Sequence, residues 1–151
     1  MTLDLWAGLH EASQQVLPIH PNYATLPIQT GFDWSALAGC PFDGLYLVVF
    51  RSVRLPAVDL DLLREQDDRA HAEALKSGGL LRYFKGDADE RGRCLSFCLW
   101  ESWEKAQRAA GGQMHREAAR ITVEMYESYL LERYELTRGG GAEAGPVFRR
   151  L

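Results

Sequence analysis

Residues 94–106 read Cys94-Leu95-Ser96-Phe97-Cys98-Leu99-Trp100-Glu101-Ser102-Trp103-Glu104-Lys105-Ala106. This stretch predicts a strand that is apolar on both faces and continues directly into the start of a helix. Because side chains alternate across a strand, Leu95, Phe97 and Leu99 share one face, which suits a helix layer. The other face carries Cys94, Ser96, Cys98 and Trp100, and it suits a sheet-to-sheet contact or a pocket wall.

A strand with two apolar faces needs cover on both sides of its sheet. In a chain of 151 residues, the chain's own helices can supply one cover. A second copy of the protein is the economical source of the other cover, which would lie on the face of Cys94 and Trp100. We therefore expect a homodimer.

Composition and charge narrow the class of protein. Hydrophobic residues make up 46% of the chain and charged residues 25%, which is an ordinary balance for one globular domain. The net charge is −4 and no basic run stands out, so we expect neither nucleic acid nor a membrane as a partner.

Cysteine usage indicates a reducing compartment. The chain has three cysteines, and Cys94 and Cys98 lie ~13 Å apart along a strand, too far for a disulfide or a shared metal ion. We expect no metal and a cytoplasmic location. Residues 1–20 contain no Lys or Arg and no long apolar run, so we expect no signal peptide.

The two ends of the chain differ from its middle. Residues 1–44 hold four of the six prolines, and we expect this N-terminal extension to pack on the domain through Trp6, Phe32, Trp34 and Phe42. Residues 139–151 begin with three glycines and predict a flexible C-terminal tail.

Residues 45–138 show a regular alternation of strand and helix patterns. The order strand, helix, strand, strand, helix, strand predicts an α+β domain with a ferredoxin-like βαββαβ sheet and its helices on one face. The strands at 45–53 and 93–100 are the most apolar and would be central. The predicted strands cover 45–53, 80–85, 93–100 and 129–137, and the predicted helices cover 59–77, 101–110 and 113–126.

This middle part resembles the dimeric α+β barrel superfamily, and most of all its antibiotic-biosynthesis-monooxygenase-like branch. The residues that carry the resemblance are Leu45-Tyr46-Leu47-Val48-Val49-Phe50, the junction Trp100-Glu101-Ser102 and the helix around Met114-His115-Arg116-Glu117-Ala118. The resemblance covers about two thirds of the chain and implies a homodimer whose two sheets face each other, with a pocket between sheet and helices in each subunit.

The resemblance also implies candidate activities. Some members oxidise flat aromatic molecules as cofactor-independent monooxygenases, and others open haem. Haem-opening relatives use an Asn on the first strand, a Trp and a His; Trp100 and His115 match the last two, but residues 45–53 contain no Asn. We therefore expect no cofactor, with haem kept as an alternative.

The candidate site residues follow from these activities. His115 would be the proton acceptor and Trp100 would stack on a flat hydrophobic ligand. His71, Tyr83, Phe97 and Tyr126 are the further candidates for ligand binding. The alternative is a non-catalytic dimeric module that binds a small molecule or a partner protein through residues 1–44, since fold analogy alone does not fix a function.

Overall fold

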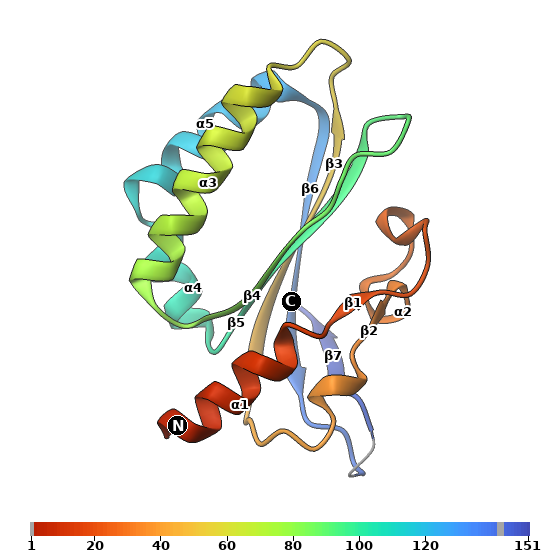
Figure 1. Ribbon diagram of the computed structural model, residues 1–151, viewed down its shortest axis with the longest axis vertical. Coiled ribbons are helices and arrows are strands. Elements are labelled where there is room, and N and C mark those ends of the chain that lie inside the picture. Colours follow the sequence, from red (N-terminus) through yellow and green to blue (C-terminus); the bar gives the residue numbers. More distant parts are fainter. Residues whose placement is uncertain (1, 142–143) are drawn as a thin grey trace.

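A five-stranded antiparallel sheet with the strand order β4-β5-β3-β6-β7 runs through the middle of the protein (Figure 1). The computed structural model describes residues 2–141 and 144–151. The predicted βαββαβ order is confirmed, and β3 is central because it pairs with both β5 and β6. The strands are β3 (Leu45–Arg54), β4 (Leu80–Lys85), β5 (Arg93–Trp100), β6 (Tyr126–Thr137) and β7 (Val147–Arg150).

Three helices lie along one face of this sheet: α3 (Leu60–Ser77), α4 (Trp103–Ala110) and α5 (Gln113–Met125) (Figure 1). Side-chain caps define two of their starts, because Asp59 accepts a hydrogen bond from the Leu62 N–H and Ser102 accepts one from the Lys105 N–H. The serine of the Trp100-Glu101-Ser102 junction is therefore the N-cap residue of α4, which begins directly after β5 ends. No helix among the described residues is long and apolar enough to cross a membrane.

The N-terminal extension covers the opposite face of the sheet (Figure 1). Phe32 lies at its centre, 1% exposed, with ring centroids 5.0 Å from Phe84 and 5.3 Å from Phe97. The indole of Trp34 donates a 2.9 Å hydrogen bond to the Ile28 carbonyl, which satisfies its buried N–H. The extension comprises α1 (Leu3–Ser13), β1 (Leu17–Pro18), η1 (Tyr23–Thr25), α2 (Ile28–Gly31), β2 (Phe32–Asp33) and η2 (Ser35–Leu37).

The structure corrects our expectation of which layer covers which face of β5. Leu95, Phe97 and Leu99 pack against the extension, and the face of Cys98 and Trp100 packs against the helices. Alternation along a strand shows which side chains share a face, but it does not show which layer lies over them. The need for a second copy over the face of Trp100 is therefore removed, and the homodimer stays a prediction.

The extension is held to the sheet by a mostly buried ion pair. The Arg51 guanidinium on β3 contacts the Glu132 carboxylate on β6 at 2.5 Å and donates to the backbone carbonyls of Ala24 at 2.9 Å and Leu26 at 2.8 Å. Burial acts to raise the pKa of Glu132, but the hydrogen bonds from Arg51 and Tyr134 outweigh it and hold this pKa below its ordinary value. Arg51 thus joins β3, β6 and the extension.

The C-terminal segment is not the flexible tail that its glycines predicted. Residues 147–150 form β7, which pairs with Tyr134–Thr137 of β6. Phe148 packs its ring 5.1 Å from Trp34 and 6.0 Å from Tyr134. The glycine run makes the turn that brings β7 back to the sheet, so a long-range pairing overrides the local composition.

We expect Arg51→Gln to loosen the extension. The change leaves the Glu132 carboxylate buried without its cation, so the free energy of unfolding should fall by about 3 kcal/mol, the usual scale for breaking a buried pair. Limited proteolysis should also cut residues 19–31 sooner. Arg69→Gln is the control, because its ion pair with Glu65 is exposed and should contribute less than about 1 kcal/mol. Equal stabilities of the two variants would contradict this role for Arg51.

Candidate functional site

The side chains on the two faces of the sheet differ in their exposure to solvent. On the extension side Leu47, Val49 and Leu95 are 0% exposed. On the helix side Val48 and Phe50 remain partly exposed, although they belong to the same central strand. The helix layer therefore leaves part of its sheet face accessible, and we call this part the helix-facing surface: Val48, Phe50, Tyr83, Ser96, Cys98, Tyr126 and Tyr129.

Four polar side chains gather at this surface around α3 and β4. The Tyr83 hydroxyl donates a 2.5 Å hydrogen bond to the Asp67 carboxylate, and the Lys85 ammonium lies 2.8 Å from the other carboxylate oxygen. The His71 ring stands edge-on to the Tyr83 ring, with centroids 4.9 Å apart. A carboxylate, a phenol, an imidazole and an ammonium group thus meet over an apolar strand, and we call them the Asp67 cluster.

The electrostatics of the cluster keep its phenol and the nearby thiol protonated. Burial, with the negative charge of Asp67 as the next cause, raises the pKa of Tyr83 far above its ordinary value. Cys98 still touches solvent, but the protein atoms around its thiol raise its pKa to about 12, and the Asp67 charge adds to this effect. At neutral pH, Tyr83 is therefore a hydrogen-bond donor and Cys98 is an inert thiol.

Two further tyrosines, Tyr126 and Tyr129, belong to the part of the helix-facing surface formed by the start of β6. The rings of Tyr126 and Tyr129 lie 5.5 Å apart, and Phe50 lies 6.2 Å from Tyr129. Burial raises the pKa of both tyrosines, so both stay protonated at neutral pH. The result is a strip of aromatic rings beside one carboxylate and one imidazole.

The sequence signal for the Asp67 cluster lies in helical spacing. Asp67 and His71 are four residues apart on α3, which places them on the same side of the helix, facing Tyr83. Asp67 is not among the residues predicted for the site, although His71 and Tyr83 are. An acidic residue one turn before a histidine, opposite a strand tyrosine, was the available signal.

His115 of α5 forms hydrogen bonds with Glu73 of the neighbouring helix α3. The Glu73 carboxylate on α3 accepts hydrogen bonds from the backbone N–H groups of Met114 at 3.0 Å and His115 at 3.2 Å, and lies 3.0 Å from the His115 Nδ1. Gly112 begins α5 with no side-chain cap, and a Cβ there would collide with Glu73. Glu73 thus caps α5 from the neighbouring helix.

Trp100 lies in a small packed cluster between the sheet and the helix layer. It is 4% exposed, and its neighbours include Tyr46, Ala74 and Ala109. Neither of the two cavities described below is lined by Trp100 or His115. Their shared pocket stays a prediction, and the observed contacts of both residues are structural.

Phe97 does not belong to the helix-facing surface. Its ring is fully buried between Phe32, Trp34 and Phe84 on the extension side. The sheet therefore separates it from His71 and Tyr83, with which we had grouped it as a ligand-binding candidate. Strand parity already placed Phe97 opposite Cys98, so this part of the prediction conflicted with the pattern of β5 itself.

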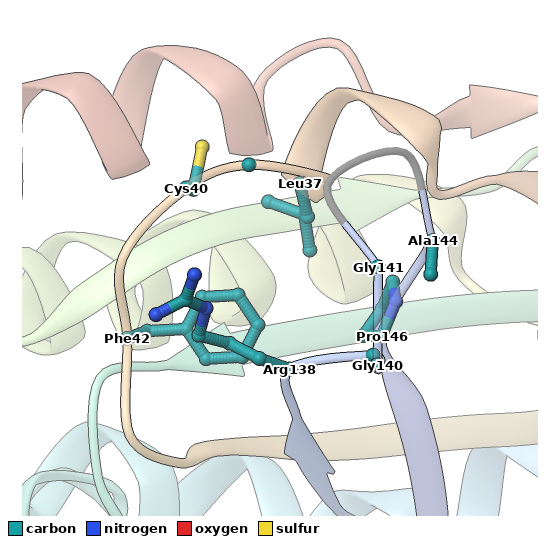
Figure 2. Close-up of a pocket in the computed structure, with 10 residues that line it drawn as sticks. Leu37, Cys40, Phe42, Arg138, Gly140, Gly141, Ala144 and Pro146 are labelled. Atoms are coloured by element: carbon teal, nitrogen blue, oxygen red, sulfur yellow. The ribbon is translucent and has the colours of Figure 1, made fainter.

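Two cavities lie on the extension side of the molecule. One of about 250 Å³ is bounded by Cys40, Phe42 and the glycines after Arg138, and Figure 2 shows Arg138 beside the Phe42 ring. Burial raises the pKa of Cys40, so its thiol is a poor nucleophile. The other, of about 520 Å³, is lined by residues of the extension, Ile19 and Asp33 among them, and by Pro146 and Phe148. Among the described lining residues of the first cavity, Arg138 is the only ionised side chain.

No metal centre is formed by the described part of the chain. Within residues 2–141 and 144–151, no three His, Cys, Asp or Glu side chains come together in a way that could hold a metal ion. With its carboxylate, phenol, imidazole and ammonium groups, the Asp67 cluster has the composition of a proton-transfer or hydrogen-bonding site.

Comparisons with known proteins agree with this fold. The family model described as PB2B2.08-like matches residues 3–148. The UPF0643 protein PB2B2.08 of Schizosaccharomyces pombe is 34% identical over 133 residues, which are 76% of this chain and 60% of that protein. The chain thus spans about 60% of the length of this curated relative.

Solved structures share the α+β fold at low identity. A Caulobacter crescentus protein, named as a candidate antibiotic biosynthesis monooxygenase, superposes with a TM-score of 0.53 at 18% identity, covering 61% of this chain and 89% of its own. A Shewanella oneidensis protein superposes with a TM-score of 0.55 at 11% identity, covering 64% and 95%. These matches show the antibiotic-biosynthesis-monooxygenase-type fold, with the extension as an addition.

We expect Glu73→Gln to weaken the junction between α3 and α5 in a pH-dependent manner. Hydrogen bonds from the Met114 N–H and from His115 lower the pKa of Glu73, so the carboxylate stabilises the fold above its ordinary pKa of 4.5. That contribution is lost as the pH falls through the lowered pKa. The variant should unfold at a lower temperature at neutral pH.

The same measurement at acid pH tests the cause. At a pH below the lowered pKa of Glu73 the wild-type carboxyl group also takes up a proton, so the two melting temperatures should converge as the pH falls. Glu124→Gln, an exposed change on α5, is the control and should leave the melting temperature unchanged at both pH values. A pH-independent difference between wild type and Glu73→Gln would contradict the capping role.

Proposed function

This chain belongs to the PB2B2.08-like family, and we propose that it binds a flat, hydroxylated aromatic molecule against the helix-facing surface, next to the Asp67 cluster. The observation that carries the proposal is the hydrogen-bonded Asp67–Tyr83 pair with His71 beside it, on a sheet face that the helices leave partly open.

We infer a flat ligand from the row of aromatic rings on this surface, which we call the aromatic strip. Phe50, Tyr126 and Tyr129 present ring faces and edges in a row, and Tyr129 is 41% exposed. Aromatic side chains bind flat rings by offset stacking or edge-to-face contact. Ligand sites are mostly apolar with a few well-placed polar groups, which is the composition of this surface.

We infer that the ligand carries a hydroxyl group because the Asp67 cluster places hydrogen-bonding side chains next to the aromatic strip. Asp67 accepts hydrogen bonds and Lys85 neutralises its charge, while His71 offers a ring nitrogen that can accept or donate a proton. A phenol that enters here could donate to His71 while Tyr83 stays protonated. The ligand would then lie with its apolar rings along β6 and its hydroxyl group towards α3.

Cofactor-independent monooxygenation is the reaction that this arrangement would support. His71 would take the phenolic proton, and the electron-rich phenolate would react with O₂ at a ring carbon that carries hydrogen. One oxygen atom would stay on that carbon as a quinone carbonyl and the other would leave as water, with the ring supplying all four electrons. The fold shared with the Caulobacter crescentus protein supports this direction, although its low identity carries the fold alone. In this proposal His71 replaces His115 as the proton acceptor.

Haem is not part of the proposal. Trp100 is packed in a cluster with Tyr46, Leu80 and alanines of the helices, and the Nδ1 of His115 lies against Glu73. The two residues suggested for haem are therefore engaged in the structure. Binding through the extension alone, the non-catalytic alternative, is also less favoured, because the extension uses its large aromatic residues to cover the sheet.

We expect His71→Ala to weaken the binding of emodin, a flat hydroxyanthraquinone, as followed by tyrosine fluorescence quenching or calorimetry. Loss of one hydrogen bond of about 1 kcal/mol corresponds to a roughly fivefold weaker affinity. Tyr129→Ala should have at least as large an effect, because it removes a stacking partner.

Two histidine variants provide matched controls. His20→Ala lies in the extension and should leave the affinity unchanged. His115→Ala separates this site from the one suggested by sequence: a loss of affinity with His115→Ala, but not with His71→Ala, would move the site to α5. If emodin does not bind, or binds all variants equally, the proposal is wrong.

A further inference from the structure

Arg54, the last residue of β3, lies at one end of the aromatic strip. Side chains alternate along a strand, so Arg54 shares the helix side of the sheet with Val48 and Phe50. Its partner in the register between β3 and β6 is Tyr126, which belongs to the strip. The chain thus places a guanidinium group next to the ring of Tyr126, on the face where we propose that a ligand binds.

A β-bulge gives Tyr126 its orientation beside Arg54. The register between β3 and β6 shifts between Val53 and Arg54, so β6 contains an extra residue at this point. Tyr126 and Tyr129 are three residues apart, and in a regular strand their side chains would point to opposite faces. The extra residue brings both rings to the same face, where their centroids are 5.5 Å apart. Bulges often re-aim a side chain in this way beside a functional site.

The positive charge of Arg54 acts on the strip and is not neutralised by a carboxylate. Burial raises the pKa of Tyr126 and of Cys94, and for both groups the charge of Arg54 is the next cause and acts against burial. The charge of Asp67 also acts on Tyr126, so this phenol lies within reach of both ends of the surface. Within residues 2–141 and 144–151, Arg54 forms no ion pair.

The guanidinium of Arg54 has hydrogen-bonding capacity that the described part of the chain does not use. Its Nε is buried and has no acceptor, which is costly for a donor unless a ligand or water supplies one. The residue as a whole is partly exposed, so a ligand can reach the guanidinium. The planar fork of an arginine matches a carboxylate, to which it donates two parallel hydrogen bonds.

We propose that Arg54 binds a carboxylate of the ligand, so that the ligand is a hydroxylated aromatic carboxylic acid. This inference rests on the proposed function, because it uses the same surface. The hydroxyl group would lie at His71, the rings over Phe50 and Tyr129, and the carboxylate at Arg54. A carboxylate conjugated with an aromatic ring is coplanar with it, so the acid keeps the flat shape that the strip requires, whereas a tetrahedral phosphate would not.

A matched pair of ligands tests this role. Emodic acid carries a carboxyl group in place of the methyl group of emodin and keeps all its hydroxyl groups. At neutral pH this carboxyl group is ionised. In calorimetry, the wild-type chain should bind emodic acid roughly tenfold to a hundredfold more tightly than emodin, the usual scale for a hydrogen bond to a charged group.

The ratio of the two affinities is the measurement to compare among variants. Both ligands share their rings and hydroxyl groups, so a general loosening of the surface changes both affinities and leaves their ratio unchanged. Arg54→Gln removes the charge and should bring the ratio to about one, because no gain is then left for the carboxylate. Arg54→Lys keeps the charge without the fork and should give an intermediate ratio.

Arg82→Gln is the matched control. Arg82 also has a buried Nε without an acceptor, but it lies on the extension side of the sheet, 5.8 Å from the centroid of the Phe84 ring. Its replacement should therefore keep the full preference for emodic acid. Circular dichroism shows whether each variant is folded.

The possible results separate this inference from the proposed function. If emodin binds and depends on His71, but emodic acid binds no more tightly, the role of Arg54 is wrong and the proposed function stands. The same follows if Arg54→Gln keeps the preference, which would assign the carboxylate to another cation such as Lys85. If neither ligand binds, both proposals are wrong.

Discussion

The central strands β3 and β5 present apolar side chains to both faces, so the sheet is stable only when two separate layers exclude water from it. This protein makes both layers from one chain, with helices on one face and an irregular extension on the other. Each fully buried Leu or Phe contributes about 2 kcal/mol, so neither layer can be removed without exposing a large part of the core. The positions of Arg51, Phe32 and β7 all follow from this need.

The two layers differ in kind, and the candidate function depends on that difference. The extension seals its face with aromatic rings and a buried ion pair, whereas the helices leave tyrosines and a carboxylate partly accessible. The proposed ligand site lies on the helix side, where Asp67 and Tyr83 form a polar pair at the end of an aromatic strip.

Local pattern predicted the elements well and their tertiary relations poorly. The strands at 80–85 and 93–100 were predicted at their observed bounds, because their leucine-rich and aromatic runs are bounded by glycines or by the polar residues Glu101 and Ser102. The choice of layer over Phe97 was wrong, since alternation carries no information about the neighbouring layer. β7 was missed because its pairing with β6 joins residues that a glycine turn separates.

The candidate site was predicted only in part for the same reason. His71, Tyr83 and Tyr126 were named from residue type, and the structure places them on one side of the sheet. Asp67 and Glu73 act through contacts between elements. Of the two, only Asp67 carries a local signal, because it lies four residues before His71.

The contact of Phe148 with Trp34 has a consequence for synthesis of the chain. The extension is synthesised before the strands that bury its aromatic rings, and β7 is synthesised after those strands. Because contacts distant in sequence form slowly, the extension must wait in a partly exposed state. The nascent chain is thus most vulnerable to aggregation, and most dependent on chaperones, until residue 150 has been made.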